Sequence, residues 1–536
     1  MFRTELSRSG NLFAEANNVR IHSAYDPINE VKKYLQNCNF SNTSVLLLLG
    51  PGLGYLLKEI QSRYPGLTII VFLFSSKFIE YYKSSEVPIW HPQSKYQLSN
   101  FLRSTISEWD IDSLRLLEWE PSARAFPDTS YFVNKEINQF VKEYNGNMMV
   151  TARNGSLWLR NLFRNFLKLQ NCVNPDKIEK PVIIAASGPS LKESLPFLKK
   201  YRKKYILWAL PSSLLFLFEE GILPDLTIAT DPGFYAACNL MSLSRFSSVP
   251  TALPLTSASL PTFKESEILL LSQSSYFENA LFNRLKLPYL SVAHHGTVAG
   301  TALYLCRHFS VQNVILAGLD LCFSDIHEHV QPHFFYRLFI SRSDRLNPFY
   351  SVRSMRTYEL APKIISGTRC RYTLPLETYA GSFSRTNTTQ EMNIYRLNPS
   401  PVLITNFTDI SHSELASLLV ESSSDAPNKI FFTRHPVPTL GEKQKILLDI
   451  LFSWEKQIKH QRSIFNREGM SVEMFLSNPI FNLAYLLQLP KLQKIMKSIK
   501  KNQFNSQANK HLCKEMFDSI YIMIERNKRR INATRR

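Results

Sequence analysis

The sequence lacks the long apolar segments of a membrane protein. Its longest apolar runs, residues 44–57 and 205–218, are interrupted by Gly, Pro or Ser. They fall short of the roughly 18–20 residues that a membrane-spanning helix needs. Residues 1–15 are polar and of mixed charge, without the continuous apolar stretch of a secretory signal. We therefore expect a cytoplasmic protein without a membrane span.

Closely spaced cysteine pairs are also missing. None of the seven cysteines belongs to a Cys-x-x-Cys motif, which excludes the zinc and redox motifs built on that spacing. An odd number of widely scattered cysteines is typical of free thiols, and we expect these to be buried.

The chain has no stretch that resembles a nucleic-acid groove. Its formal net charge is +19, but residues 491–536 alone hold 13 Lys and Arg against 3 Asp and Glu. The rest of the chain is only mildly basic, and basic and aromatic residues do not interleave along it as polynucleotide binding would require. Lys491, Lys494 and Lys497 recur at helical spacing, which a solvated helix face explains; contact with an anionic membrane or an acidic partner is the weaker alternative.

What the sequence does contain is an ordinary globular composition, 44% hydrophobic and 20% charged, in a chain too long for one core. Within residues 1–150, a strand-like run (44–49) enters a glycine-rich loop (50–54). Helical sequence (55–63) and a second strand-like run (67–74) follow. This alternation predicts a Rossmann-like N-terminal domain with a parallel sheet.

The same order recurs in residues 181–412. This segment opens with a strand-like run, a turn at Gly188 and helical sequence, and later strand-like runs end at Asp231 and Asp320. Open α/β sheets bind ligands outside the carboxyl ends of their strands, so we expect these polar residues to converge.

The remaining segments are predicted to be helical. Residues 151–180 form a linker that contains a helix over 158–169. Residues 413–536, with only Gly441 and Gly469 as glycines, are predicted to form a helical C-terminal domain with a basic tail.

The turn at Gly188 has two interpretations. A loop cut short by Gly188-Pro189 and followed by a helix presents N–H groups and a positive helix end to a phosphate, and Ser187 and Ser190 add hydroxyl donors. A tight β-to-α turn with Ser190 as N-cap explains the same residues without a ligand.

Several dispersed blocks, taken in order, decide between these interpretations. Together they resemble the motility-associated factor (Maf) glycosyltransferases over roughly residues 10–410. The blocks are residues 22–27, 50–54, 183–191, 221–225, Asp231, 295–299 and 315–320.

The resemblance implies the transfer of pseudaminic or legionaminic acid from its CMP-activated form to Ser or Thr of flagellin, with inversion. It implies an α/β fold with a Rossmann-like N-terminal domain and a sialyltransferase-like central domain; the helical C-terminal domain is expected from the sequence pattern alone. Neither a metal nor a cofactor is expected beyond the CMP-sugar, which is a co-substrate.

The resemblance also implies the site. Gly188, Pro189 and Ser190 would contact the nucleotide phosphate, with Asp231 and Asp320 at the rim of the pocket. The residues expected at the nucleotide-sugar site are Ser187, Gly188, Pro189, Ser190, Asp231, Gly296, Thr297, Gly318 and Asp320.

Such a reaction needs a base for the acceptor hydroxyl, and histidine is the natural choice at neutral pH. Six of the twelve histidines fall within residues 294–333. We favour His327, then His329, with Asp231 as a further catalytic candidate, although an ordinary loop position also explains each of these histidines.

Two weaker assignments stay open. His327, His329 and His333 would form a metal site, but their spacing matches no strong zinc signature. Tyr379 and Asn398 sit where the family has its closing segments, and they contact the substrates or serve packing.

Two other functions compete. A pterin pyrophosphokinase shares the Gly-Pro-Ser and Pro-x-Asp pattern and would hold Mg-ATP with Asp225, Asp231 and Asp320. The large N-terminal domain argues against it, because such a small kinase would not need one. The second is a non-catalytic flagellin-binding protein.

The first domain departs from a cofactor-binding pattern. After the loop at residues 50–54, the next strand reaches no carboxylate until Glu80, so the acidic residue that grips a ribose is missing. We interpret this domain as a ligand-free scaffold or as a site that binds flagellin.

Overall fold

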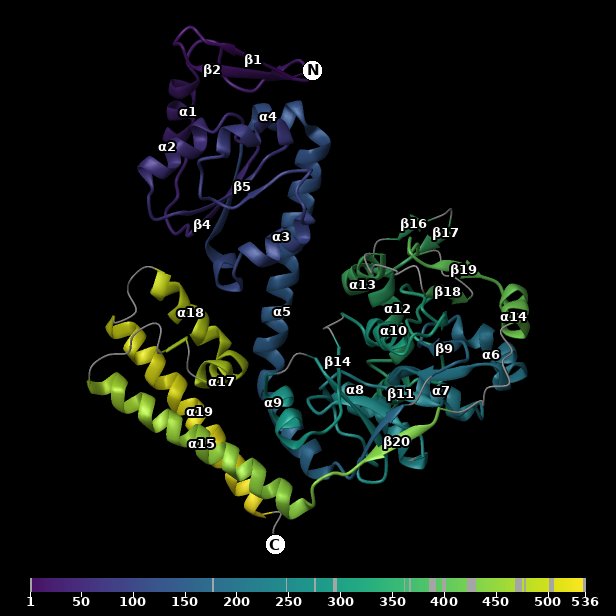
Figure 1. The fold of residues 1–536 in the computed structure, drawn as a ribbon. Coiled ribbons are helices and arrows are strands. Elements are labelled where there is room, and N and C mark those ends of the chain that lie inside the picture. Colours follow the sequence, from purple (N-terminus) through teal and green to yellow (C-terminus); the bar gives the residue numbers. More distant parts are fainter. Residues whose placement is uncertain are drawn as a thin grey trace. The chain divides into compact units, whose positions relative to one another are not determined.

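The computed structural model describes most of the chain and divides it into two compact units. The described residues are 2–175, 178–246, 248–273, 276–292, 296–360, 362–365, 368–384, 392–397, 402–421, 430–467, 475–476, 479–500 and 506–533. One unit comprises residues 1–153 and 457–523, the other residues 154–456 and 524–536. Three helices, labelled in Figure 1, contain residues of both units: α5 (Pro127–Lys168), α15 (Leu440–Arg467) and α19 (Gln507–Ala533).

The first unit is built on a four-stranded parallel sheet. Its strand order is β6 (Ile89–Trp90), β5 (Thr68–Phe72), β4 (Val45–Leu49), β7 (Leu114–Glu118). Every residue of β4 is buried, as expected for a central parallel strand covered on both faces. Helix α2 (Tyr55–Arg63) follows β4, so the predicted β–loop–α order is confirmed.

Further elements complete this unit. They are an antiparallel sheet of β1 (Phe2–Leu6), β2 (Leu12–Ala16) and β3 (Val19–Arg20), and the helices α1 (Pro27–Gln36), α3 (Leu98–Thr105), α4 (Glu120–Ala125), α17 (Pro479–Leu487) and α18 (Leu489–Lys500).

The glycine-rich loop of this unit is packed against its own chain. Gly52 has φ +62°, and a Cβ there would lie 2.4 Å from Nε2 of His22. The N–H of Leu53 donates to that same Nε2 at 3.1 Å, and the Tyr82 hydroxyl donates to the Gly52 carbonyl. His22 thus takes an N–H group at the start of α2 that a bound anion would otherwise use.

The second unit holds an eleven-stranded sheet. Its strand order is β19 (Thr408–Ile410), β18 (Asn393–Leu397), β15 (Asn313–Ala317), β9 (Val182–Ala185), β10 (Ile206–Ala209), β11 (Leu226–Ile228), β12 (Thr251–Pro254), β13 (Glu267–Ser272), β8 (Asn171–Pro175), β20 (Phe432–His435), with β14 (Leu290–Ser291) paired to β13. All described pairs are parallel except β20 with β8.

The strand order reverses at β9. From β9 the chain adds β10 to β13 on one side and later returns to add β15 and β18 on the other. The carboxyl ends of β9 and β15 therefore flank a topological switch point, where open α/β sheets bind ligands.

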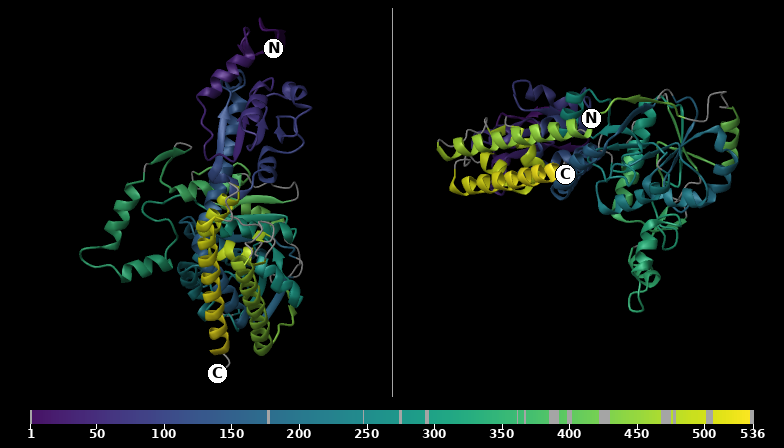
Figure 2. Two further views of the ribbon diagram at one scale, coloured as in Figure 1. Left: turned by 90° about the vertical axis from the view of Figure 1, so that its left-hand side faces the viewer. Right: turned by 90° about the horizontal axis from the view of Figure 1, so that it is seen from below.

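Helices cover this sheet and extend beyond it. They are α6 (Leu191–Lys200), α7 (Leu214–Glu219), α8 (Phe234–Leu240), α9 (Tyr276–Leu285), α10 (Val298–His308), α11 (Phe334–Ser341), α12 (Phe349–Tyr358), α13 (Leu374–Ser384) and α14 (His412–Glu421), with a hairpin of β16 (Lys363–Ile365) and β17 (Thr368–Cys370). Both views of Figure 2 show α11 and α12 projecting from the sheet.

These elements confirm the predicted α/β class and most of the predicted strands and helices. The helix predicted over residues 158–169 is the end of α5, which has 42 residues. Residues 413–536 are mostly helical, but they also contribute β20 to the central sheet. The boundaries at residues 150, 180 and 412 stay predictions.

Two further expectations concern apolar burial. None of the described helices combines the length and apolar composition that crossing a bilayer requires. All seven cysteines are free, and all but Cys38 are buried.

Two buried asparagines fix α5 to the sheet. The Asn161 amide donates to the carbonyls of Pro232 and Thr256 at 3.0 and 3.1 Å, and the Asn165 amide donates to those of Leu255 and Ser257. Helix α5 thereby holds the loops that follow β11 and β12.

The buried imidazole of His22 predicts an acid-sensitive first unit. Burial lowers the pKa of His22 to about 3, whereas the unfolded chain has the ordinary value near 6.5. As pH falls below 6.5 the unfolded state takes up a proton that the folded state refuses. Between pH 7 and pH 4 this linkage costs roughly 3 kcal/mol of unfolding free energy.

Urea denaturation from pH 7 to pH 4, read on the first unit, measures the effect. His22→Gln is expected to flatten the pH dependence. His511→Gln, at an exposed position of the same unit, is the control. Equal pH slopes for wild type and His22→Gln would contradict the argument.

Candidate functional site

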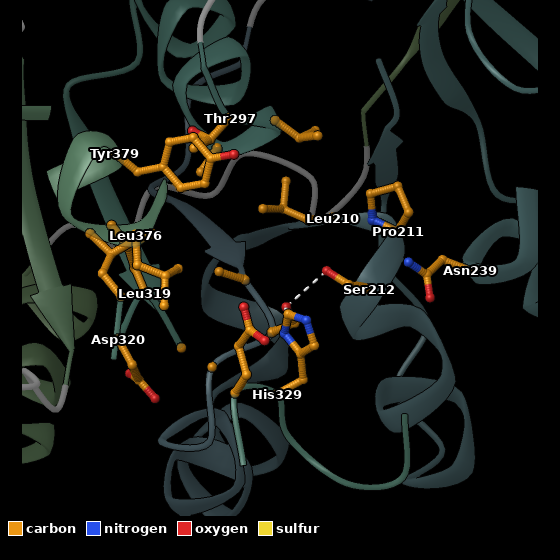
Figure 3. Close-up of a pocket in the computed structure, with 18 of the residues that line it drawn as sticks. Leu210, Pro211, Ser212, Asn239, Thr297, Leu319, Asp320, His329, Leu376 and Tyr379 are labelled. Atoms are coloured by element: carbon orange, nitrogen blue, oxygen red, sulfur yellow. Dashed lines mark hydrogen bonds between the residues drawn. The ribbon is translucent and has the colours of Figure 1, made fainter. Parts of the chain in front are cut away.

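A cavity of about 290 Å³ opens at the switch point of the second unit. Its volume lies at the lower end of the roughly 300–1,000 Å³ of small-molecule sites. Most of its wall is apolar, and its polar residues come from loops, from the start of α10 and from α8 and α13 (Figure 3). These are Ser187, Ser212, Asp231, Asn239, Thr297, Asp320, Glu328, His329 and Tyr379.

The ends of β9 and β15 meet in the wall of this cavity. The Gly188 N–H donates to the Gly318 carbonyl at 2.7 Å, which extends the β9–β15 pairing past the strands. A Cβ at Gly188 would lie 2.5 Å from Oδ2 of Asp320 and 2.6 Å from the Gly318 carbonyl. Only glycine fits there.

Asp320 caps the start of α6. Its Oδ2 accepts the Ser190 N–H at 2.8 Å, and its Oδ1 accepts the Ser190 hydroxyl. Burial raises the pKa of Asp320, and the two Ser190 hydrogen bonds act in the opposite direction. The anion at this helix start is a carboxylate of the chain itself.

This arrangement bears on the predicted phosphate loop. Ser187 and Gly188 line the cavity, whereas Pro189 and Ser190 do not, and both Ser190 donors face Asp320. Phosphate contacts from Pro189 and Ser190 stay a prediction without support from this geometry.

A second helix start does face the cavity. Gly296, Thr297, Val298 and Ala299 line it, and Thr297 is the N-cap of α10, with its hydroxyl accepting the Gly300 N–H at 3.1 Å. The first N–H groups of a helix have no partner inside it and carry its positive end. This terminus suits a phosphate.

A hydrogen-bonded chain of three side chains forms another part of the wall. The Ser212 hydroxyl donates to Oγ of Ser187 at 2.8 Å, and Ser187 Oγ is 3.1 Å from Nδ1 of His329. Figure 3 shows Ser212 and His329 together on one side of the cavity, with Tyr379 and Thr297 on another.

The surroundings of His329 favour a neutral imidazole. Burial lowers its pKa; the Glu328 carboxylate raises it in part, and the Arg353 cation lowers it again. The His333 ring stacks on it, with centroids 4.3 Å apart, and burial lowers the pKa of His333 to about 2. The Tyr336 hydroxyl accepts the His329 backbone N–H and fixes the loop.

His327 has a different place. It is not among the residues that line the cavity, and its ring packs edge-on against Tyr336. Of these two histidines, only His329 lines the cavity. The choice of base between them stays a prediction.

Asp231 presents an acid at the cavity. Its backbone carbonyl accepts the Ala258 N–H at 2.9 Å, and Asn161 of α5 holds the next carbonyl, that of Pro232. The residue is exposed, but the protein around its carboxyl group removes part of the solvation, which raises the pKa of Asp231. Burial, and then the charges of Asp231 and Glu328, raise the pKa of Tyr379.

The other predicted residues fall into three groups. Gly296, Thr297 and Gly318 lie in the wall as expected, and Tyr379 joins them. Asp225 does not, because it pairs with Arg202 at 2.9 Å. The remaining candidates, His294, His295 and Asn398, are outside the described residues.

The sequence analysis missed Ser212, Asn239 and Glu328. Ser212 follows the end of β10 and was accessible to the same strand-end rule that identified Asp231. Asn239 lies on α8 and carried no comparable signal. Within the described part of the chain, no cluster of three or more His, Cys, Asp or Glu side chains is arranged to hold a metal.

Comparisons with known proteins can now be set beside this geometry. Residues 156–326 match the family described as 6-hydroxymethylpterin diphosphokinase MptE-like. A protein of Treponema pallidum (strain Nichols) described as uncharacterised is 28% identical over 341 residues, which cover 62% of this chain and 72% of the relative. A second such protein is 24% identical over 119 residues, or 22% of this chain and 56% of the relative.

A solved structure extends the likeness to nearly the whole chain. The MAf glycosyltransferase from Magnetospirillum magneticum AMB-1 matches with a TM-score of 0.57 and 13% identity, over 99% of this chain and 92% of that one. At this identity the likeness is one of fold. The resemblance to the Maf glycosyltransferases inferred from the sequence is therefore confirmed at the level of the fold.

The close packing at Gly188 predicts a specific stability defect. Gly188→Ala places a methyl group against the Asp320 carboxylate and the Gly318 carbonyl, so the strand ends must move apart. We expect a loss of roughly 1–3 kcal/mol in unfolding free energy. Gly233→Ala is the matched control, because nothing lies within 4 Å of a Cβ at Gly233.

Chemical denaturation of both variants provides the comparison. A Gly188→Ala protein as stable as Gly233→Ala would show that the strand ends are not packed in this way.

Proposed function

We propose that this chain is a glycosyltransferase that moves a nonulosonic acid of the pseudaminic or legionaminic type from its CMP-activated form to Ser or Thr hydroxyls of flagellin. The fold likeness to a MAf glycosyltransferase over nearly the whole chain supports the class of enzyme. The finer assignment of sugar and acceptor comes from the sequence resemblance.

One observation carries the proposal: a helix start and a neutral histidine border the same cavity. The start of α10 at Thr297 and the imidazole of His329 both lie in the wall. A transfer from CMP requires these two functions together, one for the leaving phosphate and one for the acceptor proton.

The leaving group comes first. As the bond from the anomeric carbon to the phosphate oxygen breaks, CMP departs with the electron pair and negative charge grows on the phosphate. In this proposal the N–H groups of Val298 and Ala299 face that charge at the positive end of α10. The proposed reaction uses no metal and no cofactor, because the helix start stabilises the leaving group.

The acceptor is activated on the other side. Its hydroxyl oxygen bonds to the anomeric carbon while the proton passes to Nε2 of His329. The hydrogen bond between Nδ1 and Ser187 orients the ring for this role, and Ser212 in turn holds Ser187. Asp231, at the same cavity, is placed to interact with the positive charge that develops on the sugar.

The pterin diphosphokinase alternative rests on the family match of residues 156–326. It would need carboxylates for Mg-ATP. Asp231 and Asp320 line the cavity, but the Asp225 carboxylate is engaged by Arg202 and by the Leu207 N–H at 2.7 Å. Asp225 is therefore not part of the Mg-ATP site that the sequence suggested, although Glu328 adds a third carboxylate to the cavity wall.

Thermal-shift titration separates the two functions. CMP is expected to raise the unfolding midpoint without added metal, because the α10 start binds its phosphate. Thr297→Asp keeps the cap but adds a negative charge beside the phosphate, and it should lose this response, while Thr297→Ser should keep it. Stabilisation by ATP only with magnesium, and none by CMP, would favour the kinase instead.

The base assignment predicts a pH profile and a mutant pair. The pKa of His329 is lowered from its ordinary value near 6.5, so the pH at which activity falls on acidification should lie below 6.5. His329→Gln is expected to lower transfer roughly 10²-fold or more, whereas His327→Gln keeps most of it.

Initial rates from intact-mass spectrometry of flagellin measure both effects. Unchanged flagellin masses with the wild-type enzyme would instead favour a non-catalytic flagellin-binding protein. Equal rates for the two variants would remove His329 from the mechanism.

A further inference from the structure

A group of exposed aromatic side chains borders the cavity. We define the rim patch as Phe234, Tyr235, Phe335, Phe339 and Arg342. Phe234 is 64% exposed, Tyr235 51% and Phe339 41%, although all three are large apolar side chains. Exposed aromatic groups of this kind mark interaction sites.

The rim patch is contiguous across two helices. The rings of Phe234 and Tyr235 on α8 are 5.6 Å apart, and Tyr235 meets Phe335 of α11 at 5.0 Å. Phe339 follows Phe335 by one helical turn, so both lie on the same face of α11.

The patch is continuous with the proposed base. Phe335 lies 4.8 Å from the His333 ring, which stacks on His329 in the cavity wall. On the other helix, Ala236 and Asn239 of α8 line the cavity itself. Helix α8 therefore supplies part of the cavity wall as well as part of the exposed surface next to it.

The patch also carries a positive charge. Arg342 is the exposed residue at the C-terminal cap of α11, and none of the ion pairs between described residues involves it. Its charge partly offsets the rise in pKa that burial causes at the Cys238 thiol of α8. Arg337, by contrast, is paired with Glu219.

We infer that the rim patch is the docking surface for the acceptor polypeptide, with an acidic residue of that polypeptide paired to Arg342. This inference rests on the proposed function. The cavity is of small-molecule size, so we place the body of a polypeptide acceptor outside it, next to His329. Aromatic residues and arginine are the side chains that dominate such interfaces.

Binding of fluorescently labelled flagellin from the source organism to the full-length protein tests the inference. Phe234→Ala/Tyr235→Ala is expected to raise the Kd for flagellin roughly tenfold or more. Tyr276→Ala, an equally exposed aromatic position on α9, serves as the control and should leave Kd unchanged. Arg342→Glu should weaken binding, and Arg342→Lys should restore most of it.

CMP titration of the same variants keeps the two proposals separate. The rim variants should keep the wild-type thermal response to CMP, since they lie outside the nucleotide site. If CMP stabilises the protein but the rim variants bind flagellin like wild type, the docking inference is wrong and the proposed function stands. If wild type binds no flagellin, the docking inference and the flagellin acceptor of the proposed function both fall. If CMP does not raise the unfolding midpoint while the rim variants still bind flagellin more weakly than wild type, the docking inference stands and the transferase assignment is wrong.

Vesicles of anionic phospholipid are the last probe. Vesicle binding that the rim variants abolish, together with unchanged flagellin binding, would assign this surface to a membrane and overturn the inference.

Discussion

The contact between Asp320 and the start of α6 holds the second unit together where its function is expected. It joins the ends of β9 and β15, the two strands at which the order of the sheet reverses. Gly188 makes the contact possible, because any side chain there would strike the carboxylate. The cavity lies beside this junction, and Gly188, Gly318 and Asp320 form part of its wall.

In both units, a side chain accepts a backbone N–H of the glycine turn that precedes a helix. In the first, His22 accepts the N–H of Leu53 at the start of α2; in the second, Asp320 accepts that of Ser190 at the start of α6. A side chain of the protein therefore satisfies each helix start that, in a nucleotide-binding α/β domain, commonly faces a phosphate. The start of α10, by contrast, lines the cavity, and the proposed function therefore assigns phosphate binding to α10.

The sequence predicted the architecture well because its signals are local. Buried parallel strands read as apolar runs, and polar residues after their ends identified Asp231, Asp320 and Ser187 at one edge. The sequence could not show whether the N–H groups at a helix start face a ligand, because a side chain from a distant part of the chain can accept them instead. The sequence also could not show which of two histidines only two residues apart lines the cavity: we favoured His327, whereas His329 is the one in the wall.

The account as a whole depends on where a nucleotide's phosphate binds. The most direct measurement is a crystal structure of the protein soaked with CMP. The account predicts the phosphate within hydrogen-bonding distance of the Val298 and Ala299 N–H groups, in the cavity that His329 borders. A cavity that stays empty at saturating CMP, or a phosphate bound away from α10, would contradict it.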